Sequence, residues 1–260
     1  MKDLAEALVR ARRGGRRVTA QLEDLPGVEQ AYAIQDRVQA LLGRQVAGWK
    51  VARTPDGEVL SAPIFDDVVF QSGAEVPLES RMSHGFECEL AFKVEHRLSS
   101  FSRTEYGIDD VLPALGEASA ALELLSCRTE QGFQSPRPLL VADNLGSGGI
   151  VLGTPRTDWK KLNLADIGIS LNVAGDVVVD KRGENSIGDP LQAVVLLANH
   201  LARRGLSWEP GQIIMTGAFA GVHHAKPGQR VEARFEGFAP VTMLGETAES
   251  ETRNNAHAGG

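Results

Sequence analysis

Two glutamates separated by one residue, Glu87 and Glu89, have the types and spacing that most directly suggest chemistry in this chain. An apolar run without helical spacing follows them, so we expect the pair to lie on a β-strand. Residues two apart on a strand project to the same face, whereas on a helix they would diverge by about 200°. Adjacent carboxylates repel each other unless a cation or a shared proton neutralises them. The pair therefore suggests a site for a hard divalent cation, with a solvated strand face as the alternative.

A third carboxylate, Glu123, lies in the otherwise apolar run from Ala120 to Leu125. Burying it is costly unless it is paired, hydrogen-bonded or bound to a cation. Exposure to solvent or an ion pair with Arg128 would also explain it. Lys50 lies among apolar residues too, where it could transfer protons with a lowered pKa or extend to the surface.

A polar, glycine-rich segment from Asp143 to Gly149 could present backbone N–H groups to an anionic ligand. It lacks the signatures of a Walker loop and of a dinucleotide-binding loop, so a plain turn is the alternative. Asn144, together with Arg128 and Thr216, is a candidate for substrate binding.

These residues need a scaffold, and hydrophobic spacing predicts one that is mainly β with a few helices. We expect helices over 3–13, 28–42, 108–115 and 189–205, the last with Asp189 as N-cap and Pro190 in the first turn. We expect strands over 68–70, 87–94, 150–152, 169–173, 176–179, 213–216 and 230–235. A helical N-terminal region (1–45) would precede a metal-binding catalytic β-rich domain (46–245), and the polar segment 246–260 would be a disordered tail. The fold class is α+β.

Composition excludes several functions. The 27 basic and 34 acidic residues give a net charge of -7, which argues against nucleic-acid or anionic-membrane binding. No run approaches the roughly 18 apolar residues that span a bilayer, and the charged first residues do not resemble a signal peptide. The two cysteines, Cys88 and Cys127, form neither a disulfide framework nor a metal-ligand spacing. We therefore expect a cytoplasmic protein with buried thiols.

Six segments in order extend this interpretation. They are GWKVA at 48–52, E-x-E with ELAF at 87–92, ALELLSCR at 121–128, VADN-x-x-SG at 141–148, DPLQAVVLLANHLARRG at 189–205 and PGQIIMTGA at 210–218. Together they resemble the 2-oxopent-4-enoate (vinylpyruvate) hydratase and 4-oxalocrotonate decarboxylase family of the fumarylacetoacetate hydrolase superfamily. The resemblance covers about residues 5–243.

The resemblance implies a mixed, curled β-structure with a small helical N-terminal portion, assembled as a homo-oligomer. It implies that Glu87, Glu89 and Glu123 bind Mg²⁺ or Mn²⁺ and that Lys50 corresponds to the lysine of the family's GYK motif. The substrate would be a small 2-oxo or 2-hydroxy-dienoic acid from aromatic catabolism. Hydration of 2-hydroxypenta-2,4-dienoate to 4-hydroxy-2-oxopentanoate is the expected reaction, with Lys50 moving a proton or holding the substrate carboxylate, and Ser147 orienting water or substrate.

One position departs from that pattern. Leu60 falls where the family's hydratases carry a catalytic aspartate, and Asp67 matches a different position. A missing acid/base group costs about 10²–10⁴-fold in rate, so another group, such as His84, would have to substitute, or the reaction differs. Decarboxylation of a 2-oxo-dienedioate is therefore a competitor, as is acylpyruvate hydrolysis. A non-catalytic partner subunit of a related hydratase or decarboxylase is the alternative from another class, against which the intact Glu87, Glu89, Glu123 and Lys50 speak.

Overall fold

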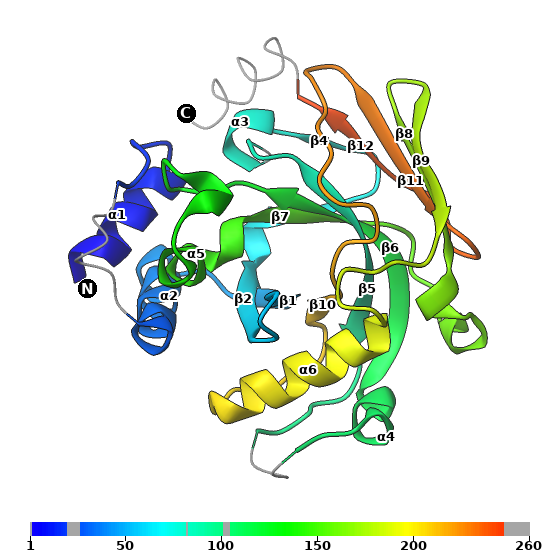
Figure 1. The fold of residues 1–260 in the computed structure, drawn as a ribbon, viewed down its shortest axis with the longest axis horizontal. Coiled ribbons are helices and arrows are strands. Elements are labelled where there is room, and N and C mark those ends of the chain that lie inside the picture. Colours follow the sequence, from blue (N-terminus) through cyan, green and yellow to red (C-terminus); the bar gives the residue numbers. More distant parts are fainter. Residues whose placement is uncertain (1, 20–26, 82, 101–104, 247–260) are drawn as a thin grey trace.

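The computed structural model describes residues 2–19, 27–81, 83–100 and 105–246, whose strands form two β-sheets (Figure 1). The helices are α1 (Lys2–Arg12), α2 (Val28–Leu42), α3 (Leu78–Arg81), α4 (Ile108–Val111), α5 (Arg137–Ala142) and α6 (Pro190–Arg203). The strands are β1 (Val46–Arg53), β2 (Val59–Phe65), β3 (Val69–Gln71), β4 (Ala74–Val76), β5 (Phe86–Val94), β6 (Leu115–Leu125), β7 (Ser147–Leu152), β8 (Gly168–Val173), β9 (Asp176–Arg182), β10 (Ile213–Met215), β11 (Arg230–Phe235) and β12 (Val241–Gly245).

Both sheets are mixed. The larger one has the order β2-β1-β10-β5-β6-β7-β3, in which β1 and β10 run parallel, as do β7 and β3. The smaller one has the order β4-β12-β11-β8-β9. This arrangement brings β1, from the N-terminal third, next to β10, from the C-terminal fifth, so residues remote in sequence share one sheet.

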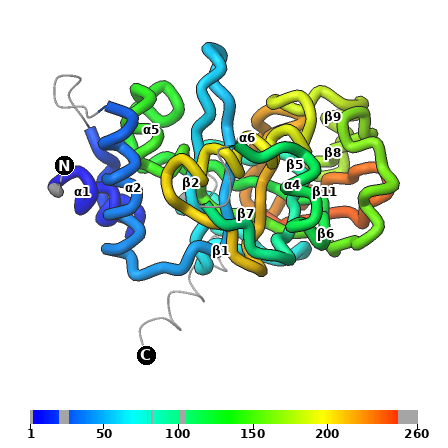
Figure 2. The backbone as a smooth tube through the Cα atoms, turned by 90° about the horizontal axis from the view of Figure 1, so that it is seen from below, coloured from blue at the N-terminus to red at the C-terminus, as the bar shows by residue number. Residues whose placement is uncertain are grey.

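The main core lies between the two sheets and α6. It includes Cys88, Leu90 and Phe92, which alternate with the glutamates along β5 and therefore point to the opposite face. A second cluster joins α1, α2 and α5 to Leu60 and Ala62 of β2. Figures 1 and 2 place these three helices at one end of the molecule and β8, β9 and β11 at the other. The face of β5 that carries the glutamates thus looks away from the main core.

The predicted α+β fold class is confirmed, and several predicted elements appear with small shifts. Helix α6 begins as expected, with Pro190 in its first turn and the Asp189 side chain accepting a hydrogen bond from Leu191 N at 2.8 Å. The helix predicted over 108–115 is shorter: the α-helix ends at Val111, a 3-10 turn covers Leu112–Ala114, and Leu115 begins β6. Strand β6 itself was not predicted as a strand, and neither was helix α5. The predicted tail falls almost entirely outside the described residues.

Candidate metal centre and active site

Strand register brings the three glutamates together. Glu87 of β5 lies directly opposite Glu123 of β6, and Glu89 lies two residues further along β5 on the same face. One carboxylate oxygen from each residue lies within 4.8 Å of the other two. Glu89 and Glu123 are almost fully buried, and Glu87 is partly exposed. The structure therefore places the predicted ligands in one cluster with a single accessible side.

The charges of this cluster are only partly compensated. The Lys50 ammonium forms a close ion pair with Glu123 Oε1, so three carboxylates and one ammonium leave a formal charge of -2 (-3 + 1). Burial and repulsion by Glu123 raise the pKa of Glu87 to about 7, and burial also raises the pKa of Glu89 well above its ordinary value. Three oxygen ligands with two excess negative charges fit a hard divalent cation such as Mg²⁺ or Mn²⁺.

Lys50 is held in the site from two sides. Its ammonium also donates to the Leu145 carbonyl at 3.2 Å. Burial lowers its pKa, but attraction to Glu123, with smaller contributions from Glu87 and Glu89, outweighs burial and raises the pKa overall. A lowered pKa was one of the two possibilities for Lys50; the structure instead gives a buried, charged lysine.

The loop that supplies this carbonyl has an unusual backbone. Asn144, Leu145 and Gly146 all have positive φ, at 54°, 50° and 68°. A left-handed leucine is uncommon and costs about 1–3 kcal/mol, so its surroundings must hold it in place. The Asn144 amide donates to the Pro63 carbonyl at 3.4 Å, and its buried Oδ1 atom has no hydrogen-bond partner among the described residues. The strain positions the Leu145 carbonyl toward Lys50.

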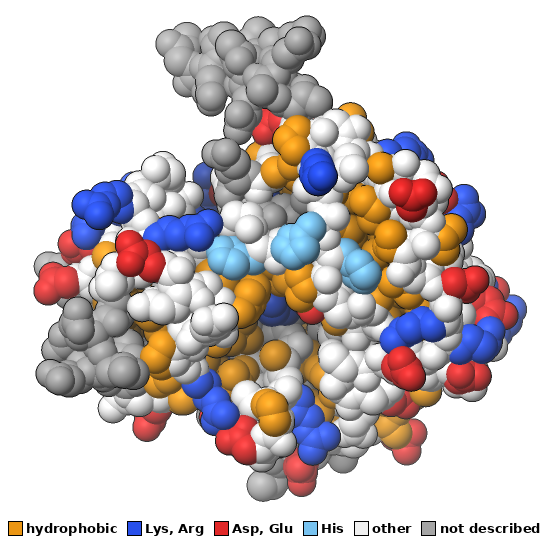
Figure 3. All heavy atoms as spheres, turned by 45° about the horizontal axis from the view of Figure 1, so that its top comes forward, with side chains coloured by type: hydrophobic (Ala, Val, Ile, Leu, Met, Phe, Trp, Pro, Cys, Tyr) orange, Lys and Arg blue, Asp and Glu red, His pale blue; other side chains and the backbone are white. Residues whose placement is uncertain are grey.

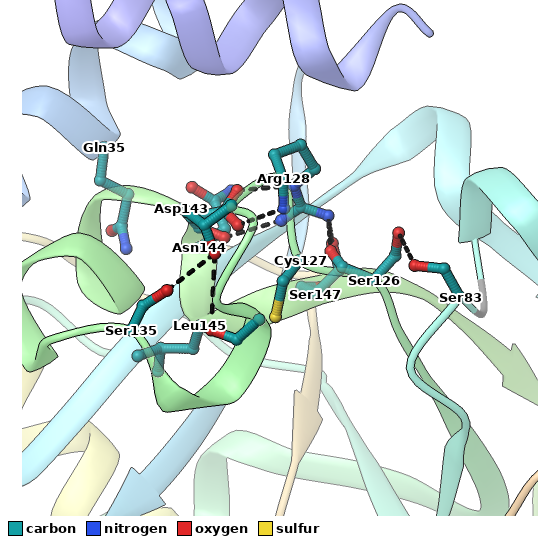
Figure 4. Close-up of polar contacts among 12 residues, drawn as sticks. Gln35, Ser83, Ser126, Cys127, Arg128, Ser135, Asp143, Asn144, Leu145 and Ser147 are labelled. Carbon is teal, nitrogen blue, oxygen red and sulfur yellow. Dashed lines mark hydrogen bonds and ion pairs between the residues drawn. The ribbon is translucent and has the colours of Figure 1, made fainter. Parts of the chain in front are cut away.

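Arg128 is fixed by Asp143 (Figure 4). The Arg128 Nε donates to Asp143 Oδ1 at 2.6 Å, and its terminal nitrogens donate to the carbonyls of Asp143, Ser126 and Ser147. Both side chains are buried. Arg128 therefore pairs with Asp143 rather than with Glu123, and its guanidinium ties the 126–128 segment to the loop before β7.

Thr216, directly after β10, is also held by a hydrogen bond to the protein. Its hydroxyl donates to the Leu90 carbonyl at 2.8 Å, and the following Gly217 N–H donates to Glu89 Oε2 at 2.9 Å. Gly217 has a φ of 93°, and a Cβ atom there would lie 2.8 Å from Ser186 Oγ. Only glycine suits this turn, which presents a backbone donor to one of the three carboxylates.

A pocket of about 270 Å³ opens beside the cluster. Lys50 and Glu87 are its ionisable lining residues, and the other seven are apolar: Ala52, Leu60, Leu125, Phe133, Leu140, Leu145 and Val222. Figure 3 shows a hollow lined with hydrophobic side chains and bordered by histidines on one side. Leu60, at the position expected to carry an aspartate, thus contributes an apolar wall. Ser147, Asn144, Arg128 and Thr216 do not line this pocket.

A larger cleft of about 760 Å³ lies further along the same sheet face, where Lys93 of β5 and Glu117 of β6 line it. It contains none of the three clustered glutamates and not Lys50. The smaller pocket is the better candidate active site, because only there do perturbed ionisable groups converge.

Other candidate groups are unsuited to catalysis. Burial raises the pKa of the Cys88 thiol to about 12 and that of Cys127 to about 11, so neither is a ready nucleophile. His84 Nδ1 contacts Ser83 Oγ at 2.9 Å, and its ring packs edge-on against Phe133. His84 thus contacts one of the lining residues but is not itself among them.

Several residues of the site were not singled out from the sequence. Phe133 and Leu140 belong to this group. The glycine-containing segments at Asp143 and Thr216 did carry a signal, because polar residues and glycine after an apolar run are typical of loops. The pocket walls carried no such signal, because they come from segments far apart in the chain.

The chain is similar to known proteins over most of its length. The chain is 29% identical to 2-keto-4-pentenoate hydratase of Paraburkholderia xenovorans (strain LB400) over 257 residues, covering 92% of this chain and 93% of that protein. It is 28% identical to 2-oxo-hept-4-ene-1,7-dioate hydratase of Escherichia coli, covering 86% and 90%. The solved structure of 4-oxalocrotonate decarboxylase from Pseudomonas putida G7, complexed with magnesium and adipate, has the same fold, with a TM-score of 0.82, 22% identity and coverage of 94% and 96%. The model of the fumarylacetoacetate (FAA) hydrolase C-terminal family matches residues 65–243, which contain all three clustered glutamates. With that match over more than half of its length, the chain belongs to the fumarylacetoacetate hydrolase C-terminal family.

Proposed function

We propose that this protein is a lyase that uses Mg²⁺ or Mn²⁺ and adds water to a small 2-hydroxy-dienoate, such as 2-hydroxypenta-2,4-dienoate. The observation that carries the proposal is the cluster of Glu87, Glu89 and Glu123 with Lys50, which has a formal charge of -2 and borders a pocket of about 270 Å³. The names of the relatives at 28–29% identity support hydration as the reaction.

The three glutamates would hold the cation, and backbone groups keep them in position. When bound, the cation would supply positive charge that stabilises the enolate form of the 2-oxoacid. Gly217 N–H already fixes one oxygen of Glu89, and Lys50 fixes one oxygen of Glu123. Such neighbouring contacts orient the ligands of metal sites.

Lys50 stays protonated in this site, so we assign it to holding charge rather than to abstracting protons. Its ammonium would attract the substrate carboxylate or the enolate oxygen at the pocket floor. Ketonisation of the dienol and addition of water then give a 4-hydroxy-2-oxoacid. The roles proposed for Ser147 and Asn144 in orienting water or substrate stay predictions. For Arg128 and Thr216 we propose positioning roles, since their polar groups are bonded to the protein.

Decarboxylation of a 2-oxo-dienedioate is the second candidate. The observation that favours it is Leu60, because the pocket wall at this position offers no acid or base. Decarboxylation needs mainly the electron sink, so it tolerates this loss better than hydration does.

The test is to offer both substrates to the purified protein with Mg²⁺ or Mn²⁺. Hydration predicts loss of the ultraviolet absorbance of 2-hydroxypenta-2,4-dienoate, and decarboxylation predicts carbon dioxide from 2-oxohex-3-enedioate. Glu89→Gln should abolish turnover. Glu117→Gln, which removes a surface carboxylate of the same sheet, should leave it unchanged. Full activity of the Glu89→Gln variant would refute the metal assignment.

The described residues contain no helix long and apolar enough to cross a membrane. A homo-oligomer stays a prediction, which light scattering of the purified protein can test. Cytoplasmic location and association with a related enzyme also stay predictions.

A further inference from the structure

The lining of the pocket beside the carboxylate cluster combines two charged side chains with seven apolar ones. Glu87 and Lys50 are the charged residues, and the apolar ones include Leu60, Leu125 and Leu140. A substrate whose 2-oxoacid head lies at Glu87 and Lys50 must place its tail against apolar side chains, because the rest of the lining is apolar.

The tail end offers a second carboxylate no partner. Lys50 is the one cation among the described lining residues, and it is already bound to Glu123 and to the Leu145 carbonyl. Arg128 is not in the lining, and its nitrogens are bonded to Asp143 and to backbone carbonyls. A carboxylate placed among leucines without a partner would keep its full desolvation penalty.

The mouth of the pocket is also hydrophobic. Phe133 and Val222 line it, and their exposed fractions are 43% and 46%. They are two of six large hydrophobic side chains that are exposed among the described residues. Exposed apolar side chains gathered at a pocket are typical of a binding surface.

Building on the proposed function, we propose that this site selects 2-oxoacids that carry an apolar alkyl or alkenyl tail and rejects those whose tail ends in a second carboxylate. Leu60, Leu140 and Phe133 are the residues that determine this selectivity. The substrate preference of this chain would then differ from that of relatives whose names specify dicarboxylates. A site that rejects a second carboxylate also favours hydration over decarboxylation of a dienedioate.

Calorimetry with unreactive 2-oxoacids and Mn²⁺-loaded protein tests the inference without turnover. 2-Oxohexanoate and 2-oxoadipate have the same six-carbon chain and differ by a terminal carboxylate. We expect 2-oxohexanoate to bind at least about tenfold more tightly than 2-oxoadipate. It should also bind more tightly than 2-oxobutanoate, by about fourfold for each added methylene that is buried.

A charge placed at the mouth provides the converse test. Val222→Arg adds a cation at an exposed position, so the variant should fold, and the preference for 2-oxohexanoate should fall by about fivefold. Val177→Arg adds the same charge on β9, at a position that is 67% exposed and outside the pocket lining, and should keep the preference of the unmodified protein.

The outcomes separate the two proposals. Equal or tighter binding of 2-oxoadipate, with Mn²⁺-dependent binding intact, overturns the inference and leaves the proposed function standing. A Val222→Arg variant with the same preference as Val177→Arg also overturns it. If neither 2-oxoacid binds in a Mn²⁺-dependent manner, the proposed function fails, and the inference fails with it.

Discussion

Replacing Glu87 with glutamine should stabilise the metal-free protein while removing a metal ligand. Burial and repulsion by Glu123 raise the pKa of Glu87 from 4.5 to about 7 in the folded protein. The folded state therefore binds more protons than the unfolded state between these values, and the stability of the metal-free protein falls as the pH rises through this window. The difference of about 2.5 pKa units (7 − 4.5), at about 1.4 kcal/mol per unit, gives an upper bound between about 3 and 4 kcal/mol.

Because Glu87 is partly exposed, we expect a smaller gain, about 2 kcal/mol at pH 8 for Glu87→Gln in EDTA. At pH 5 the folded carboxyl is already protonated, so the gain should shrink below about 1 kcal/mol. Urea unfolding at both pH values measures these differences. With Mn²⁺ the order should reverse, because only the unmodified protein gains binding free energy.

Glu117→Gln is the matched control. It lies on the same strand as Glu123 but in a surface ion pair with Lys93, so its effect should stay below about 1 kcal/mol at either pH. Two results would refute the conclusion that the Glu87 charge is uncompensated in the metal-free protein. In one, the Glu87→Gln variant is less stable than the unmodified protein at pH 8 in EDTA. In the other, the variant is stabilised equally at both pH values.

Four further outcomes follow from the same geometry. Mn²⁺ affinity, measured by electron paramagnetic resonance, should rise at least about tenfold per pH unit below pH 7, because protons on Glu87 and Glu89 compete with the cation; a flat profile would contradict this. Lys50→Met should lower turnover by about 10²-fold or more and destabilise the metal-free protein more at pH 8 than at pH 5, as urea unfolding would show. Asp143→Asn should cost about 3–5 kcal/mol in the same assay, since it leaves the buried Arg128 guanidinium without its carboxylate; a cost under about 1 kcal/mol would show that the pair is not needed. Gly217→Ala should weaken Mn²⁺ binding by about tenfold, because its positive φ and the contact with Ser186 oppose a side chain; unchanged affinity would exclude a role for its N–H in fixing Glu89.

The glutamates of β5 were predictable because strand periodicity alone puts Glu87 and Glu89 on one face. Their position opposite Glu123 was not, since β6 was not predicted as a strand. Its sequence, LGEASAALELL, is rich in alanine and buried over most of its length, so it lacks both strong β-propensity and polar alternation. The role of Glu123 as a metal ligand was instead predicted from the family resemblance of the ordered motifs.

The ion-pair partners of Arg128 and Lys50 were also not predictable from the sequence. A sequence shows that a buried charge needs a partner, but the choice between Glu123 and Asp143 for Arg128 depends on tertiary contacts. The ion pairs 50–123 and 128–143 are resolved only by the fold. The apolar pocket was equally hidden, since Ala52, Leu125 and Val222 come from three distant segments.

The two parts of the site depend on different parts of the fold, and this matters for how the enzyme can diverge. The glutamates depend on the pairing of β5 with β6, whereas five of the seven apolar lining residues come from β2, a short helix and loops: Leu60, Phe133, Leu140, Leu145 and Val222. Substitutions in the walls can therefore accumulate without altering the ligand set. New substrate tails are accessible by exchanging a few side chains around a conserved reaction, and the site can explore them at little risk to its metal chemistry.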